Sequence, residues 1–283
     1  LGASDFVLGL IGFSYGLAYV FAAVYFGKLS ERMGYSRSIA AGMFLYGLVV
    51  SLYIFIRLPA AFIAIRAAEA LAMALVWPSI EALLKFFKFE VNEEAGKSIR
   101  ISAGKEIALP IFVYGFSASI IYAFYPAYAA RIFSLRWAGL ILSVSSLFVI
   151  LAFFISPLLR HEPRISITAG IALQLFYFLI FLSRSPLVHM LALSLIFFGI
   201  GLIYYFVLYR ITLTEIEGLG LRTGIFESSI GAGYTIDPLL GGLFSILGAR
   251  YIWLFAFATA LSLVAVWSAL EGFLLLGRSA SGP

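Results

Sequence analysis

The segment GKLSERMGYSR at residues 27–37 decides how this sequence folds, because it is short and charged and lies between two long apolar runs, residues 6–26 and 38–57. A helix that rises about 1.5 Å per residue needs roughly 20 apolar residues to cross the hydrocarbon core of a bilayer. Both flanking runs meet that requirement. The sequence therefore predicts two membrane-spanning helices joined by a charged loop.

Outward from this segment, long apolar runs and short polar connections alternate along the chain. Of the 283 residues, 63% are hydrophobic and 12% are charged, whereas a soluble domain has about 25% charged residues. The runs are continuously apolar, which argues against the alternating strands of a β-barrel. We predict an all-α, polytopic membrane helix bundle with about nine transmembrane helices, near residues 6–26, 38–57, 60–84, 107–129, 137–156, 165–183, 186–209, 223–247 and 251–276.

The distribution of Lys and Arg predicts the orientation of the chain. When residues 27–37 are placed in the cytoplasm, alternation puts 13 of the 19 basic residues in cytoplasmic loops and 5 in outer loops, with Arg66 inside a span. This bias agrees with the positive-inside rule. We therefore expect a multi-pass protein of the cell membrane, with the C-terminus cytoplasmic and the N-terminus of this chain extracellular.

The composition argues against several other classes of protein. The net charge of +5 does not indicate nucleic-acid binding, because the basic residues fall singly between apolar runs. With no cysteine and two histidines, neither a disulfide framework nor a metal site is expected. The sequence contains no nucleotide motif or catalytic triad pattern, so we expect neither a cofactor nor enzymatic activity.

A weak internal repeat divides the chain into two pseudo-symmetric halves. The segment SDFVLGLI at residues 4–11 matches SLRWAGLI at residues 134–141, with the same spacing from Ser to Gly. The repeat predicts a partial first half with three spans, residues 1–105, and a second half with six spans, residues 106–283. Two complete halves would contain twelve spans, as in transporters built from parallel repeats. The alternative is that such short matches arise by chance in apolar sequence.

Several segments resemble the major facilitator superfamily. Residues 27–37 are similar to its signature Gly-x-Leu-Ala-Asp-Arg-x-Gly-Arg-Lys, which lies between the second and third spans, although Glu31 replaces the Asp and residues 35–36 replace a basic pair. The segments RAAEA at residues 66–70 and GAGYTIDPLLGG at residues 231–242 are similar to its fourth and eleventh spans. The resemblance implies two six-helix halves, with the family's first, fifth and sixth spans missing from this chain.

The resemblance also implies a cytoplasmic gate in the signature segment. In the family, the acid of this turn meets the N-terminal end of the eleventh span, which points to Glu31 against the amides near Arg222 to Gly224. An anion at a helix N-terminus is stabilised by roughly 0.3–1 kcal/mol when exposed. The alternative is a solvated loop that only sets the topology. The gate candidates, including glycines that permit positive φ and close helix approach, are Gly27, Glu31, Arg32, Gly34 and Arg37.

Four charged residues inside predicted spans are candidates for coupling, because a charge there costs several kcal/mol unless it is paired or faces a water-filled cavity. Arg66 and Glu69 are three residues apart, so they share a helix face and can pair. They are candidates for a proton or substrate site, with a structural ion pair as the alternative. Glu227 and Asp237 lie in a glycine-rich span, where we expect either cavity lining or, alternatively, positions near the membrane surfaces.

Aromatic and amide side chains inside the spans are candidates for a solute cavity. The alternatives are interfacial belts or packing for the aromatic residues and an interhelical hydrogen bond for the glutamine. The cavity candidates are Trp77, Tyr122, Tyr125, Gln174, Tyr204 and Tyr205.

Together these features predict a monomeric secondary active transporter in the lipid bilayer. It would move a small-molecule solute by alternating access, coupled to an ion or proton gradient. The alternative is a non-transporting membrane scaffold or the remnant of a transporter, which the missing spans favour.

Overall fold

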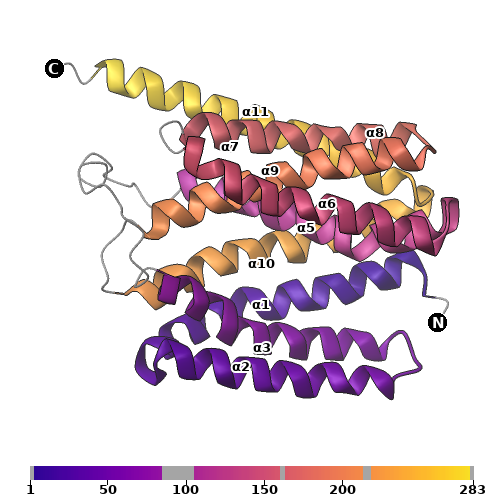
Figure 1. Cartoon of the computed structure of the whole chain (residues 1–283), viewed down its shortest axis with the longest axis horizontal. Helices are drawn as coiled ribbons and strands as arrows, with labels where there is room; N and C mark the ends of the chain where they lie inside the picture. Colours follow the sequence, from indigo (N-terminus) through magenta and orange to yellow (C-terminus); the bar gives the residue numbers. More distant parts are fainter. Residues whose placement is uncertain (1–2, 85–104, 160–162, 213–217, 281–283) are drawn as a thin grey trace. The chain divides into compact units, whose positions relative to one another are not determined.

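The computed structural model describes residues 3–84, 105–159, 163–212 and 218–280, and the regular elements in these ranges are all helices (Figure 1). In chain order they are α1 (Asp5–Met33), α2 (Tyr35–Ser51), η1 (Leu52–Ile54), α3 (Ala61–Leu84), α5 (Lys105–Ile132), α6 (Leu135–Ile155), η2 (Ser156–Leu159), α7 (Pro163–Ala172), η3 (Leu173–Phe176), α8 (Tyr177–Leu182), α9 (Pro186–Thr212), α10 (Leu219–Phe244), η4 (Ser245–Leu247) and α11 (Tyr251–Ala280).

The predicted helical bundle is confirmed. Within the described ranges, nine helical segments are long and apolar enough to cross a membrane, and each coincides with one predicted run. The sixth of these segments is interrupted, because α7 and α8 are joined by the tighter turn η3. Many of the basic residues behind the predicted orientation fall in residues 85–104 and 160–162, outside the described part, so the orientation stays a prediction.

The connection after the first span is shorter than the sequence predicted. The expected loop at residues 27–37 is almost wholly helical, since α1 continues to Met33 and α2 begins at Tyr35. No proline interrupts residues 27–33, and Gly34 alone reverses the chain with φ at +88°. Its N–H donates to the carbonyl of Ser30 at 2.9 Å and closes the last turn of α1.

The helices form two compact units. Unit 1 is Leu1–Tyr125 with Val207–Ala249, and unit 2 is Pro126–Phe206 with Arg250–Pro283. Unit 1 therefore contains α1, α2, α3, the first part of α5 and α10. This division differs from a boundary at residues 105 and 106, where the internal repeat places the halves, and the repeat halves stay a prediction.

Unit 1 is built on backbone contact between α1 and α10, which run antiparallel. In Figure 1, α1 lies between α10 and the pair formed by α2 and α3, and it packs against all three. A Cβ atom on Gly16 would overlap the main chain at Tyr234 and Thr235, and one on Gly27 would overlap the carbonyl oxygen of Gly220. Glycine at these positions is what lets the two helix backbones touch.

Unit 2 has an aromatic core. Trp253 of α11 is fully buried, and its ring packs beside Tyr128 at 5.4 Å and Tyr177 at 6.3 Å between centroids. The indole N–H of Trp267 donates to Thr168 Oγ1 at 2.8 Å, which ties α11 to α7. Elsewhere, large apolar side chains such as Phe21 and Phe154 are more than two-thirds exposed, as expected of helices that face lipid.

Candidate functional site

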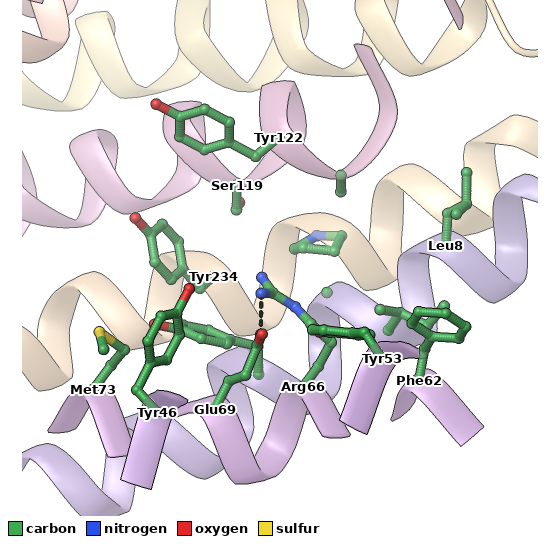
Figure 2. Close-up of a pocket in the computed structure, with 15 residues that line it drawn as sticks. Leu8, Tyr46, Tyr53, Phe62, Arg66, Glu69, Met73, Ser119, Tyr122 and Tyr234 are labelled. Carbon is green, nitrogen blue, oxygen red and sulfur yellow. Dashed lines mark hydrogen bonds and ion pairs between the residues drawn. The ribbon is translucent and has the colours of Figure 1, made fainter. Parts of the chain in front are cut away.

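Unit 1 contains a cavity of about 580 Å³ that is rich in tyrosine. Small-molecule sites commonly measure about 300–1,000 Å³ and combine aromatic walls with a few polar groups. The charged groups in its wall are Arg66 and Glu69 of α3 (Figure 2). The other lining residues are Leu8, Ile11, Gly12, Tyr15, Tyr46, Tyr53, Phe62, Met73, Ser119, Tyr122, Ala123, Tyr234 and Pro238.

Arg66 and Glu69 form an ion pair, as their spacing predicted. The guanidinium Nη1 of Arg66 donates to Glu69 Oε2, the bond that Figure 2 marks with a dashed line. The Glu69 side chain is only 3% exposed, whereas the Arg66 side chain is 37% exposed. Arg66 therefore keeps guanidinium surface that a solute in the cavity can reach.

Tyrosines lie beside this ion pair in the cavity. The guanidinium carbon of Arg66 lies 4.6 Å from the ring centroid of Tyr15 on α1, a cation–π distance. Tyr53 of η1 lines the same cavity as Arg66 and Glu69. Tyr15 in turn lies 5.9 Å from the ring of Tyr234 on α10. The charges thus sit between aromatic groups from several helices of one unit.

Asp237 lies behind the cavity wall and not in it. It is fully buried, and its Oδ2 accepts a hydrogen bond from Ser119 Oγ at 2.9 Å. Its Oδ1 is buried without a hydrogen-bond partner among the described residues. Because Ser119 and Pro238 both line the cavity, this carboxyl group is separated from a solute by a single layer of side chains.

Glu227 is buried between helices. It lies neither at an exposed position near a membrane surface nor in the wall of this cavity. Only 3% of the residue is exposed, and its Oε2 accepts a hydrogen bond from the Tyr19 hydroxyl of α1 at 2.5 Å. The helix that carries Glu227 and Asp237 stays helical from Leu219 to Phe244. Its glycines serve close packing, for example Gly233 against the backbone of Gly115 in α5, and not local unwinding.

The signature segment lies at the end of unit 1 where α1 and α10 meet, which we call the loop end. Glu31 Oε1 accepts a hydrogen bond from the Leu221 N–H, in the first turn of α10, at 3.1 Å. The family resemblance implied a contact of this type with the amides near Arg222 to Gly224. The observed partner, Leu221, is one residue before that range. Gly27 lies in the backbone contact with α10, and Arg32 and Arg37 are exposed.

The remaining cavity candidates are placed differently. Tyr122 lines the cavity, whereas Trp77 is 43% exposed and Tyr125 is fully buried, and neither is in the wall. Gln174 of unit 2 donates to the carbonyls of Gly170 and Ile196 at 2.9 and 3.4 Å. Its contact with α9 matches the interhelical hydrogen bond considered as its alternative. Tyr204 and Tyr205, also of unit 2, pack edge-on against Phe153.

Sequence reasoning missed most of the aromatic wall. Tyr15, Tyr46, Tyr53 and Tyr234 were not among the candidates, although all four lie in or beside predicted spans. With 16 tyrosines in the chain, residue type does not distinguish a cavity position from a lipid-facing one. A signal was present for Tyr15, because it and Tyr19 are one helical turn apart on a face that also carries Gly12 and Gly16.

The described residues define a polytopic helical membrane protein with a polar, tyrosine-rich cavity in unit 1. Residues 1–87 match the model of the Major Facilitator Superfamily. Two solved structures have a similar fold: the nucleoside transporter NupG (TM-score 0.64, 13% identity, 95% of this chain and 91% of that chain covered) and a point mutant of NupG (TM-score 0.69, 11% identity, 94% and 91% covered). No curated protein matches the chain in sequence.

At 11–13% identity, the likeness to NupG shows the fold alone. The family model matches the part of the chain that contains the signature segment at residues 27–37, which resembles the same family.

Proposed function

We propose that the chain is a secondary transporter that binds a small polar solute in the cavity of unit 1 and moves it by alternating access. The observation that carries this proposal is the Arg66–Glu69 ion pair in the wall of a tyrosine-rich cavity. An ion pair inside a membrane span costs free energy to bury, and a purely structural pair has no need of a partly exposed guanidinium. Arg66 supplies hydrogen-bond donors and Glu69 supplies acceptors, so a polar solute finds both in one place.

Nucleosides are the solutes that we propose to test first. NupG is described as a nucleoside transporter, and the cavity of this chain offers the complementary chemistry. A planar base can pack against Tyr15, Tyr46 or Tyr234, since aromatic rings interact favourably when stacked. The ribose hydroxyls and the polar edge of the base can then reach Arg66 and Glu69.

We propose further that transport is coupled to an ion or proton gradient. Glu69, Glu227 and Asp237 are each at least 97% buried within unit 1. A carboxylate in the membrane interior is costly, so a proton or cation that neutralises it with the solute favours the closed cavity. The Glu31 contact at the loop end acts as a gate in this scheme, because it is weak enough to break during each cycle.

The test is uptake of radiolabelled uridine into proteoliposomes under an inward proton gradient. We expect uptake that a protonophore abolishes and that Arg66→Gln and Glu69→Gln each reduce about tenfold or more, since a hydrogen bond to a charged group contributes about 1.5–3 kcal/mol. The matched control is Arg136→Gln, which removes an exposed arginine of unit 2.

Two outcomes would contradict the proposal. Equal uptake by Arg66→Gln and the unaltered protein would show that the ion pair is not part of the solute site. Absence of protonophore-sensitive flux for a panel of nucleosides, sugars and amino acids would favour the non-transporting scaffold. Solute binding to the purified protein, followed by its melting temperature, separates failure to bind from failure to move the solute.

A further inference from the structure

Helices α5 and α10 close tightly around Asp237, which is 0% exposed. Gly233 and Gly241 lie one turn before and one turn after Asp237, on the same face of α10. A Cβ atom on Gly233 would overlap the backbone nitrogen of Phe116 in α5. One on Gly241 would lie 2.8 Å from the ring of Phe124, also in α5. The carboxyl group of Asp237 therefore lies between two close contacts of the helices, which keep water away from it.

The hydrogen bonds around Asp237 are too few for an ionised carboxylate. Its Oδ1 has no hydrogen-bond partner among the described residues, and its Oδ2 lies 2.9 Å from Ser119 Oγ. Ser119 Oγ also lies 3.0 Å from the carbonyl oxygen of Phe116. A serine has one O–H to donate, so Ser119 cannot fully serve both acceptors. An ionised Asp237 would thus be buried with at most one hydrogen bond from the described residues, although a buried charge is costly unless it is paired.

A single proton on Asp237 removes this shortage. With the proton on Oδ2, Asp237 donates to Ser119 Oγ, and the Ser119 O–H can donate to the Phe116 carbonyl. Oδ1 then belongs to a neutral acid, whose burial costs much less than that of a carboxylate. Building on the proton coupling proposed above, and resting on it, we propose that Asp237 carries the transported proton and that Ser119 passes this proton between Asp237 and the cavity.

Ser119 connects Asp237 with the cavity. It lines the cavity, whereas Asp237 does not, and Figure 2 shows Ser119 across the cavity from Arg66 and Glu69. In proton uptake, a hydronium ion in the cavity gives a proton to Ser119 Oγ while the Ser119 O–H proton moves to Asp237 Oδ2. Release runs in reverse and returns the proton to cavity water. Each transfer moves one proton and leaves Ser119 as a hydroxyl group.

The site suits a proton better than a metal cation. The contact between Asp237 and Ser119 supplies one carboxylate and one hydroxyl group, whereas a hard cation such as Ca²⁺ takes about 6–8 oxygen ligands. The described residues contain no group of three or more His, Cys, Asp or Glu side chains that could hold a metal ion. A proton needs only the hydrogen-bond acceptor that Ser119 supplies.

The water of the cavity links solute binding to proton binding. Water behind a single layer of side chains stabilises the ionised form of Asp237, and a solute that displaces this water favours the protonated form. Arg66 and Glu69 are paired with each other, so they add little net charge near Asp237. The titratable groups that face the cavity from the other elements are tyrosines, which are uncharged near neutral pH: Tyr15 of α1, Tyr46 of α2, Tyr53 of η1, Tyr122 of α5 and Tyr234 of α10.

Isotope labelling of aspartate can isolate this site, because the chain contains two aspartates, Asp5 and Asp237. In Asp5→Asn, the one labelled carboxyl side chain is that of Asp237. We expect its infrared spectrum near neutral pH to show the C=O band of a protonated aspartate, although an aspartate in water is ionised there. The band should be absent when both aspartates are replaced by asparagine. An ionised Asp237 near neutral pH, or a band that Na⁺ removes at constant pH, would overturn the proposal.

The role of Ser119 is tested by the rate at which this band shifts after rapid mixing into heavy water. Ser119→Ala should slow the shift about tenfold or more, because a positioned proton-transfer group typically contributes a factor of about 10²–10⁴. Ser119→Thr keeps the hydroxyl group and should restore the rate. The matched control is Ser117→Ala, which removes another buried hydroxyl group of α5 outside the cavity wall. An equal or faster shift in Ser119→Ala would overturn Ser119 as the route of the proton.

Transport measurements distinguish failure of this proposal from failure of the proposed function. The side chain in Asp237→Asn is permanently neutral, so this variant should still exchange uridine across proteoliposomes at equal pH but should not accumulate it under an inward proton gradient. Accumulation equal to that of the unaltered protein would overturn the assignment of the proton to Asp237 and leave the transporter proposal standing. A protonated Asp237 band without uptake of any tested solute would contradict the transporter proposal and leave the protonation of Asp237 standing.

Discussion

Replacing Gly16 by alanine tests the backbone contact on which unit 1 is built. The new methyl group would overlap the main chain of α10 at Tyr234 and Thr235. These are backbone atoms of a helix, so no side-chain rotation can relieve the overlap. Helices α1 and α10 must move apart locally, and the wall of the cavity that Tyr15 and Tyr234 form moves with them.

The size of the effect follows from a matched substitution. Gly47→Ala in α2 meets no atom within 4 Å, so it shows only the helix-forming preference of alanine, about 0.5–1 kcal/mol of stabilisation. Gly16→Ala gains the same helix-forming preference but also introduces the overlap with α10. Overpacking of this kind typically costs about 1–3 kcal/mol. The free energy of unfolding should therefore be about 1–3 kcal/mol lower for Gly16→Ala than for Gly47→Ala.

The assay is thermal unfolding of both variants in the same detergent at one heating rate. At about 2–4 °C per kcal/mol for chains of 150–250 residues, Gly16→Ala should melt several degrees below Gly47→Ala. Melting of Gly16→Ala at or above the temperature of the control would show that α1 and α10 are not in backbone contact at this level.

Three further substitutions test single features. Gly34→Ala should destabilise the protein by about 1–3 kcal/mol, because Gly34 has φ at +88°, a backbone conformation that residues with a Cβ rarely adopt. The control is Gly139→Ala, where a Cβ meets no atom within 4 Å; Gly34→Ala melting no lower than this control would contradict the expectation. Glu31→Gln should weaken the loop-end contact by about 0.3–1 kcal/mol, which changes the uptake rate but hardly the melting temperature, and an unchanged rate argues against a gate. Ser119→Ala removes the hydrogen bond that Asp237 Oδ2 accepts from Ser119 Oγ and should lower the free energy of unfolding by about 1.5–3 kcal/mol, so unaltered melting would count against that bond.

Spans were predictable because they rest on composition over long windows. Each of the nine apolar runs became a helix, since a bilayer leaves a continuous apolar run little alternative to helix. The ends of the helices were predicted less well than their existence. Residues 27–33 are charged and polar, which suggested a loop, yet nothing in them breaks a helix, so α1 continues until Gly34 reverses the chain.

The candidate site also has one part that the sequence predicts and one part that it does not. The Arg66–Glu69 pair is local, and the geometry of a single helix predicts it from a spacing of three residues. The tyrosines of the cavity wall come from five elements, α1, α2, η1, α5 and α10. Which tyrosines face inward depends on how each helix is rotated about its axis. That rotation is set by packing, here by glycines of α1 that meet the backbone of α10, and no single-helix pattern contains it.

The buried position of Glu227 shows the limit most clearly. In the sequence Glu227 is a charge near the start of a predicted span. In the structure its Oε2 accepts a hydrogen bond from the Tyr19 hydroxyl, which joins α10 to α1 across 208 residues of sequence. One turn away on α10, Thr223 donates to the Pro78 carbonyl of α3. Only the pairing of helices in three dimensions supplies that information.

Helix α10 connects the features that matter for function. Its first turn meets Glu31, and its next turns hold Thr223 against α3 and Glu227 against Tyr19 of α1. Tyr234 and Pro238 complete the cavity wall. All of these contacts depend on the close approach of α10 to α1. A small displacement of α10 along or away from α1 would therefore change the loop-end contact, the Tyr19–Glu227 hydrogen bond and the cavity together. In the proposed transport cycle, gate closure and solute binding can then be linked through one rigid helix, without a separate chain of side chains to carry the signal.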